Sequence, residues 1–196
     1  TEYKKLSHAL SGKGACALFG LPASGRAQVY AALCRQLDKP LCIVTPGEAE
    51  ATRFAADLNT LGIPAAVFPA RDYVLRPIEG TAREYEYRRL AVLGELVGGR
   101  LRAVAVPAEA LTQFTTPKED FCANTRTLHA GDTLLRDDLL AALFGAGYTR
   151  RAQVDGPGQF SVRGDIVDIF APDQKMPVRM EFWGDEIDTL HTFDLT

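Results

Sequence analysis

Short apolar runs alternate with longer amphipathic stretches over the first 112 residues of the chain. The apolar runs, each of strand length, occupy residues 15–19, 41–45, 65–68 and 102–106. The amphipathic stretches, each long enough for a helix, occupy residues 25–37, 48–61 and 82–97. Strands that alternate with helices are typical of βαβ units, so this pattern predicts an α/β domain built on a parallel sheet.

The pattern changes after Thr112. Residues 115–120 are polar and contain a proline, which is typical of a linker. The elements expected next are a short strand at residues 125–129 and a helix from Asp132 or Thr133 to Gly145 or Gly147. We therefore predict two domains, residues 1–117 and residues 118–196.

Three strand candidates lie close together in the second predicted domain, at residues 159–163, 166–170 and 178–183. Gly164-Asp165 separates the first two candidates, and Gly184-Asp185 follows the third, so both pairs supply residues that favour tight turns. This spacing predicts a smaller α+β domain with an antiparallel sheet.

The composition favours a protein partner over a nucleic acid. The 196 residues carry a formal net charge of -3, and 46% of them are hydrophobic, as in ordinary globular proteins. The pI of 5.6 lies far below the value of about 9 typical of a dedicated nucleic-acid domain. Weak, salt-sensitive DNA contact through Arg83, Arg88, Arg89 and residues 100–102 stays open as an alternative.

The cysteines and the ends of the chain also bear on its class. Four cysteines without a C-x-x-C pair and three scattered histidines predict no zinc site. Cys16 and Cys42 lie in apolar runs, where we expect reduced, buried thiols. Without an apolar run of about 18 residues or a signal peptide, we expect a cytoplasmic protein with no membrane span. The missing initiator methionine and the abrupt end at Thr196 lead us to expect a part of a longer protein.

A degenerate phosphate-binding loop is predicted between the first strand and the first helix. Gly20, Ser24 and Gly25 keep the spacing of a Walker A motif, GxxxxGK[ST]. Arg26 replaces the lysine, and Ala27 replaces the hydroxyl residue that would bind Mg²⁺. We therefore expect no bound nucleotide and no other cofactor.

No other catalytic arrangement is predicted from the sequence. GxSxG and HExxH motifs are absent. Asp165 and Asp168 lie three residues apart near a turn, where we expect solvated carboxylates. The prediction is therefore a protein without catalytic residues or a metal, and not an enzyme in its own right.

One face of the predicted second sheet has the composition of a protein-binding surface. Strand alternation places Arg179, Glu181 and Trp183 on the face opposite Met180, and it leaves Arg163 facing outward as well. Arginine and tryptophan are enriched in interface hot spots. In the alternative interpretation, Trp183 covers a small second core and the arginines are merely solvated. Alternation alone leaves both interpretations open.

Two runs in this region, GQFSVRGDIVDIF and PVRMEFWGDEIDTLHTFD, resemble the second domain shared by UvrB and the bacterial transcription-repair coupling factor (Mfd). The run FPARDYVLRPIEGTAREYEYRRLAVL is similar to the coupling factor's version of the first domain. The resemblance covers nearly the whole chain and implies a RecA- or helicase-like first domain, similar to domain 1a of UvrB. UvrB keeps an intact Walker A motif and a tyrosine-rich hairpin, and the lack of both here favours the coupling factor's N-terminal UvrB-like module.

The resemblance also implies a function in transcription-coupled nucleotide excision repair. The family's surface for UvrA maps onto Arg163, Arg179 and Trp183, with tryptophan where the family usually has phenylalanine. The implied role is to recruit UvrA to stalled RNA polymerase. The ATP-dependent DNA translocase, and the full-length protein's contacts with RNA polymerase and DNA, would lie outside this chain. The alternative is a truncated UvrB-type ATP-dependent helicase subunit that recognises DNA damage.

Overall fold

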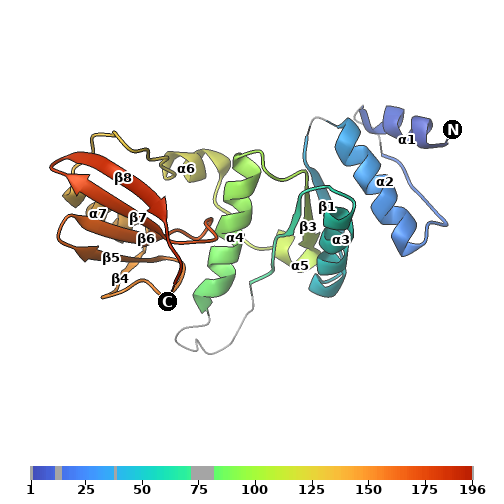
Figure 1. Ribbon diagram of the computed structural model, residues 1–196. Coiled ribbons are helices and arrows are strands. Elements are labelled where there is room, and N and C mark those ends of the chain that lie inside the picture. Colours follow the sequence, from blue (N-terminus) through green and yellow to red (C-terminus); the bar gives the residue numbers. More distant parts are fainter. Residues whose placement is uncertain (1, 12–14, 38, 72–81, 196) are drawn as a thin grey trace. The chain divides into compact units, whose positions relative to one another are not determined.

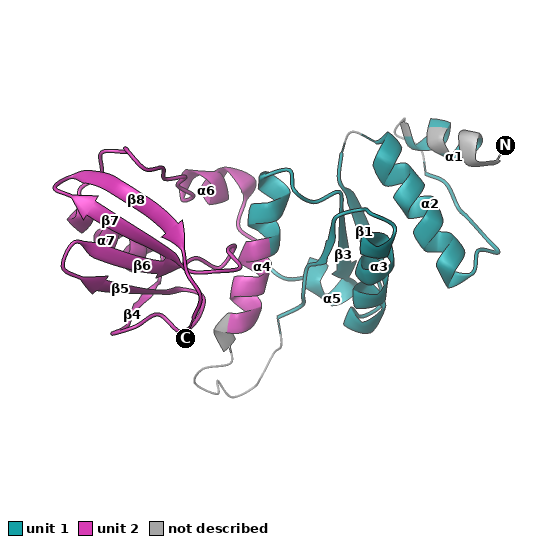
Figure 2. Cartoon of the chain, in the orientation of Figure 1, with its two compact units in different colours: residues 1–77, 92–114 teal, residues 78–91, 115–196 magenta. Residues whose placement is uncertain are grey.

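The chain forms two compact units in a computed structural model that describes residues 2–11, 15–37, 39–71 and 82–195 (Figure 1). The first unit takes residues 1–77 and 92–114, and the second takes residues 78–91 and 115–196 (Figure 2). The domain limits of 1–117 and 118–196 stay a prediction, and each unit is described by itself.

A three-stranded parallel sheet forms the centre of the first unit. Its strands are β1 (Leu41–Thr45), β2 (Ala65–Val67) and β3 (Ala103–Pro107), in the order β1-β3-β2. Leu41 and Ala65 both lie opposite Ala103, on the two sides of the central strand. Three of the four predicted strands and the parallel sheet are therefore confirmed.

Helices cover both faces of this sheet, as the alternation along β3 requires. Ala103 and Ala105 pack in one core cluster with α2 (Ala23–Gln36) and α3 (Glu48–Thr60). Val104 and Val106 pack in another cluster, with the C-terminal half of α4 and with α5. Helix α4 spans Ala82–Val97, and α5 spans Ala108–Leu111. The three predicted helices of this region are thus confirmed to within two residues at each end.

The expected strand at residues 15–19 is wrong. These residues belong to no strand, and their side chains are exposed. A short apolar run becomes a strand only when another strand pairs with it, and none does so here among the described residues.

The thiols of Cys16 and Cys42 are both exposed, against expectation, and Cys34 in α2 is the buried one. A further helix, α1 (Glu2–Ser11), was not predicted.

The second unit contains a five-stranded mixed sheet. Its strands run in the order β4-β5-β6-β7-β8 and occupy Thr149–Arg150, Gln159–Arg163, Ile166–Phe170, Val178–Trp183 and Glu186–Thr192. The four strands from β5 to β8 pair antiparallel, and the three predicted strands keep their predicted bounds. The prediction of an antiparallel sheet is nevertheless wrong for one strand pair, because the short strand β4 pairs parallel with β5.

The two tight hairpins of this sheet form at the predicted turn residues. Gly164 has a φ of +63° and Gly184 a φ of +61°, and neither following aspartate has a positive φ. A glycine with positive φ at the first central position alone is the pattern of a type II′ turn, whose twist suits antiparallel strands.

Helix α7 (Arg136–Gly145) covers one face of the mixed sheet and closes the second core. The core joins two leucines of the helix to one face of the strands; its buried members are Leu139, Leu143, Phe160, Val167, Met180, Phe182 and Ile187. The helix begins later than expected, because Asp132 and Thr133 pair with β8 instead. It ends as expected, with Gly147 at a φ of +82° just after the C-cap.

Two other predictions for the second unit are wrong. Residues 118–120 of the expected linker start a short helix, α6 (Lys118–Ala123), with Glu119 and Asp120 in its first turn. Acidic side chains at that end of a helix favour it electrostatically. Residues 125–129 form no strand.

Among the described helices, none has the length and apolar content needed to cross a lipid bilayer.

Candidate protein-binding surface

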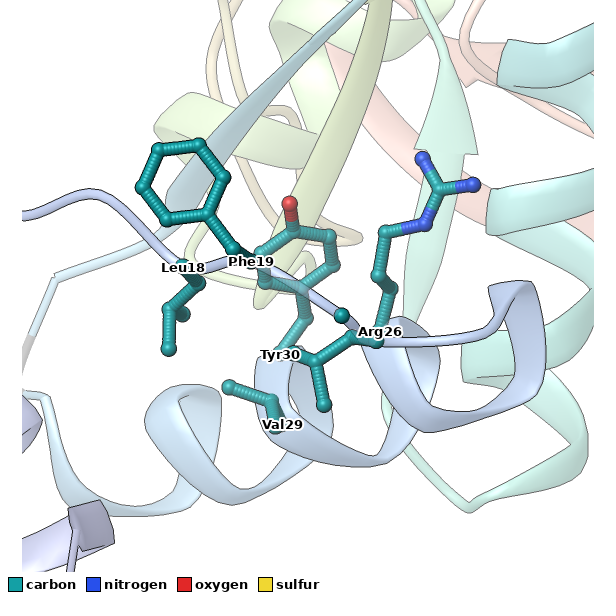
Figure 3. A pocket seen from close by; sticks show the side chains of 7 residues that line it. Leu18, Phe19, Arg26, Val29 and Tyr30 are labelled. Carbon is teal, nitrogen blue, oxygen red and sulfur yellow. The ribbon is translucent and has the colours of Figure 1, made fainter.

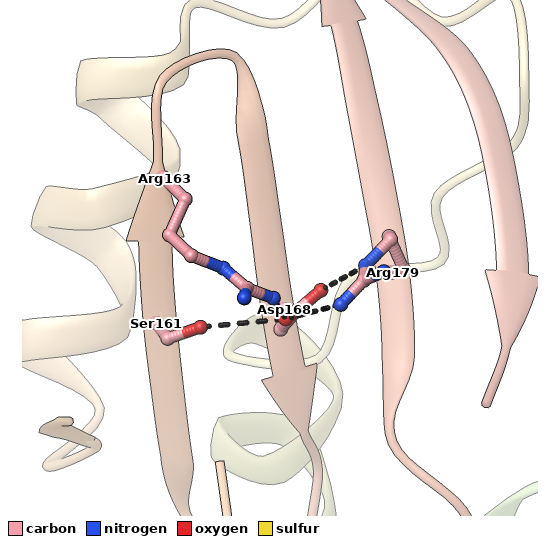
Figure 4. A network of polar contacts seen from close by, with 4 residues as sticks. All are labelled: Ser161, Arg163, Asp168 and Arg179. Carbon is pink, nitrogen blue, oxygen red and sulfur yellow. Dashed lines mark hydrogen bonds and ion pairs between the residues drawn. The ribbon is translucent and has the colours of Figure 1, made fainter. Parts of the chain in front are cut away.

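Four polar side chains meet on the face of the mixed sheet that points away from α7. Ser161 on β5, Asp168 on β6 and Arg179 on β7 lie opposite one another in the strand register. Arg163, at the end of β5, reaches the same point (Figure 4). Asp168 lies on the middle strand of the three, so its carboxylate is shared by side chains from both neighbouring strands. We call these four residues the Asp168 cluster.

Asp168 accepts all the hydrogen bonds that hold this cluster together. Arg179 binds it in a bidentate way, with Nε 2.7 Å from Oδ1 and Nη2 2.9 Å from Oδ2. Nη2 of Arg163 donates to Oδ2 at 2.8 Å, and the Ser161 hydroxyl lies 3.4 Å from the same oxygen. The Asp168 side chain is only 2% exposed.

The two arginines keep this buried carboxyl group ionised. Burial raises the pKa of Asp168, but hydrogen bonds from Arg179 and Arg163 and their positive charges lower it, and the result lies below the ordinary value. The expectation of a solvated Asp168 is therefore wrong, because the residue lies inside β6 between two cationic side chains. Asp165 is solvated as expected, with its side chain 80% exposed beside Arg136.

Arg179 has a second partner that the sequence did not suggest. Its guanidinium carbon lies 4.8 Å from the ring centroid of Phe193, just beyond the end of β8. The Arg179 side chain is 28% exposed and that of Arg163 is 53% exposed. Both arginines are thus held by the protein while part of each remains accessible.

Trp183 ends β7 and lies open to solvent. It is 83% exposed, whereas Phe182 beside it is buried in the core with Met180. The interpretation in which Trp183 covers a second core is therefore wrong. A bulge between this hairpin's strands makes Asp188 an extra residue on β8, so β7 keeps its alternation. Trp183 hence shares a face with Arg179, at about 13 Å along the strand.

The degenerate phosphate-binding loop differs from its prediction. Helix α2 begins at Ala23, so Ser24, Gly25, Arg26 and Ala27 are helical, and Gly20, with a φ of +77°, precedes the helix. Without the strand at residues 15–19, the strand–loop–helix context of a Walker A motif is missing.

Two side chains of this region differ from those that a Walker A motif uses. Arg26 forms an ion pair with Glu50 at 3.4 Å, and Ala27 is buried and offers no ligand to a metal. A cavity of about 270 Å³ lies beside Arg26 (Figure 3). The side chains seen there are those of Leu18, Phe19, Arg26, Val29 and Tyr30.

Two of the arginines considered for DNA contact are committed to other partners. Arg89 is buried, and its Nη2 donates to the Thr115 hydroxyl at 2.9 Å. Arg102 donates to the carbonyl oxygens of Cys34 and Leu37. These two guanidinium groups therefore bind groups within the protein.

Comparison with known proteins adds the family. Residues 127–196 match the UvrB interaction domain. The transcription-repair-coupling factor of Mycobacterium bovis is 38% identical over 182 residues, covering 89% of this chain and 14% of that protein. That of Bacillus subtilis is 29% identical over 179 residues, covering 90% of this chain and 15% of that protein. The UvrABC system protein B of Chlorobium limicola is 28% identical over 193 residues, covering 91% of this chain and 28% of that protein.

Both units lie within these matches, and the Asp168 cluster and Trp183 lie within the UvrB interaction domain. The chain is therefore a UvrB-like module, with a UvrB interaction domain at residues 127–196. Its matches to the transcription-repair-coupling factors, over about nine-tenths of its length, support an N-terminal UvrB-like module of that kind. It spans about a seventh of the length of the coupling factors it matches.

Proposed function

We propose that this chain is the recruiting arm of a transcription-repair-coupling factor, which binds UvrA and brings it to a stalled RNA polymerase. The observation that carries the proposal is the exposed Trp183 on the same sheet face as the Asp168 cluster, inside the UvrB interaction domain. DNA translocation and contacts with RNA polymerase belong to the rest of such a protein.

The physical properties of this face suit a protein partner. Tryptophan and arginine are the side chains most often found in interface hot spots, because they combine a large apolar area with hydrogen-bond donors. Trp183 is already exposed, and the heads of Arg163 and Arg179 are already held by Asp168. Arg179 in particular, held by two hydrogen bonds, has little conformational freedom left for UvrA binding to remove, which favours affinity.

Calorimetric titration of UvrA with this chain tests the proposal. We expect Trp183→Ala and Arg179→Ala each to weaken binding by about 2 kcal/mol or more, the usual threshold for a hot spot. Phe19→Ala is the matched control, because Phe19 is an aromatic side chain 89% exposed in the first unit. Binding by the Trp183→Ala variant at the strength of the unmodified chain would contradict the proposal.

We also propose that the chain has no ATPase activity of its own. The support is that Ala27 offers no Mg²⁺ ligand and that Arg26 is ion-paired with Glu50. Titration with Mg-ATP is expected to show no saturable binding in the micromolar range. Saturable binding in the micromolar range would favour the second candidate, a truncated UvrB-type helicase subunit. The similarity to UvrABC system protein B supports this candidate.

A further inference from the structure

Asp168 is a single buried carboxylate that contacts both arginines of the proposed UvrA-binding surface. We infer that Asp168 is the positioning residue of that surface, which holds the heads of Arg163 and Arg179 in the geometry that UvrA recognises. This inference rests on the proposed function. Asp168 itself is only 2% exposed, so it acts through the arginines and not by touching the partner.

The hydrogen-bond geometry explains why one carboxylate is enough. Two parallel bonds to Arg179 fix both the position and the plane of its guanidinium group. Nη1 of Arg179 is left without a partner among the described residues, so it remains available as a donor. Arg163 is held by one bond and is the more exposed of the two. The pair therefore combines one rigid cation with one that adapts.

Pre-ordering of the arginines matters because their side chains are long. An unrestrained arginine samples many rotamers, and it loses this side-chain entropy when it is immobilised. In the folded chain, Asp168 and the Phe193 ring already restrict the Arg179 side chain. Its entropy is therefore lost on folding and not on binding. Without the carboxylate charge, the side chains of both arginines should become mobile, so that UvrA binding has to order them.

A double-mutant cycle on UvrA affinity separates positioning from folding. Asp168→Asn keeps the shape of the side chain and removes its charge. We expect it to weaken UvrA binding about tenfold or more in the unmodified chain, and by about threefold or less when Arg179 is already alanine. Asp155→Asn, an exposed aspartate in the same unit, is the control and should bind as the unmodified chain does. No loss on Asp168→Asn, or the same loss in both backgrounds, would overturn the inference.

A second measurement needs neither UvrA nor a variant. In the unmodified chain, we expect the side-chain Nε–H of Arg179 to exchange with solvent at least about tenfold more slowly in NMR than that of the exposed Arg151. Equal exchange rates would overturn the inference, even if the Asp168→Asn variant does not fold. If the unmodified chain fails to bind UvrA, or binds it equally after Arg179→Ala, the proposed function fails, and the exchange rates still report on Asp168.

Discussion

At the scale of single residues, the mixed sheet contains a buried carboxylate, that of Asp168. Replacing a buried ion pair by apolar groups is often neutral, but removing one partner leaves the other without compensation. The Asp168 cluster places a buried carboxylate between two guanidinium groups that stay partly in water. Such an arrangement places most of the desolvation cost on the anion, since the cations keep part of their hydration.

Acid sensitivity follows from the same residue. Because the pKa of Asp168 is lower in the folded chain than its ordinary value of 3.8, ionised Asp168 stabilises the fold above that value. The stabilisation is lost as the pH falls through the lowered pKa. We expect the free energy of unfolding, measured with urea between pH 5 and pH 3, to decrease less in Asp168→Asn than in the unmodified chain.

The exposed Asp165 gives the control for this acid dependence. Its side chain is 80% exposed and pairs only with the surface residue Arg136 among the described residues. Asp165→Asn should therefore show the same decrease in stability between pH 5 and pH 3 as the unmodified chain. An equal decrease in Asp168→Asn as well would show that Asp168 does not carry the effect.

At the scale of elements, what could be predicted depended on whether the signal was local. The hairpin of β5 and β6 could be predicted because Gly164-Asp165 fixes the turn and the flanking residues have strand composition. Residues 15–19 have the same apolar character, but a strand also needs a partner, which no local pattern supplies. The two-residue strand β4 carries too little sequence to give any signal.

In the candidate site, too, only the residues with a local signal could be predicted from the sequence. Alternation places Arg163, Arg179 and Trp183 on the outer face, since the strand period is a local property. The burial of Asp168 depends on the register that brings Ser161 and Arg179 opposite it, and register is a property of the assembled sheet. One signal was present: an aspartate in the middle of the apolar run IVDIF requires a cationic or hydrogen-bonding partner.

At the scale of the whole molecule, the second unit includes residues from the first half of the sequence. Residues 78–91, the first part of α4 among them, group with residues 115–196. Tyr87 of α4 lies against Gly158, and Arg89 donates to Thr115. Tyr148 is near enough to Tyr87 that burial, Asp173 and Tyr87 together raise the pKa of Tyr148 to about 12. The compact unit is therefore larger than the C-terminal segment that carries the proposed binding surface.

The contact between Tyr87 and Gly158 tests whether this part of α4 is needed for the second unit. A Cβ at Gly158 would clash with the Tyr87 hydroxyl oxygen, and the φ of Gly158 is +72°. Gly131 also has a positive φ, +89°, but has open space around it, so Gly131→Ala measures backbone strain alone, about 1 kcal/mol. We expect Gly158→Ala to lower the free energy of unfolding by about 2–3 kcal/mol, through strain together with displacement of Tyr87.

In a Tyr87→Ala background, the destabilisation caused by Gly158→Ala should fall to that of Gly131→Ala, as measured by urea unfolding. If the cost of Gly158→Ala is the same with and without Tyr87, then α4 does not pack there in solution, and the second unit is complete without residues 78–91.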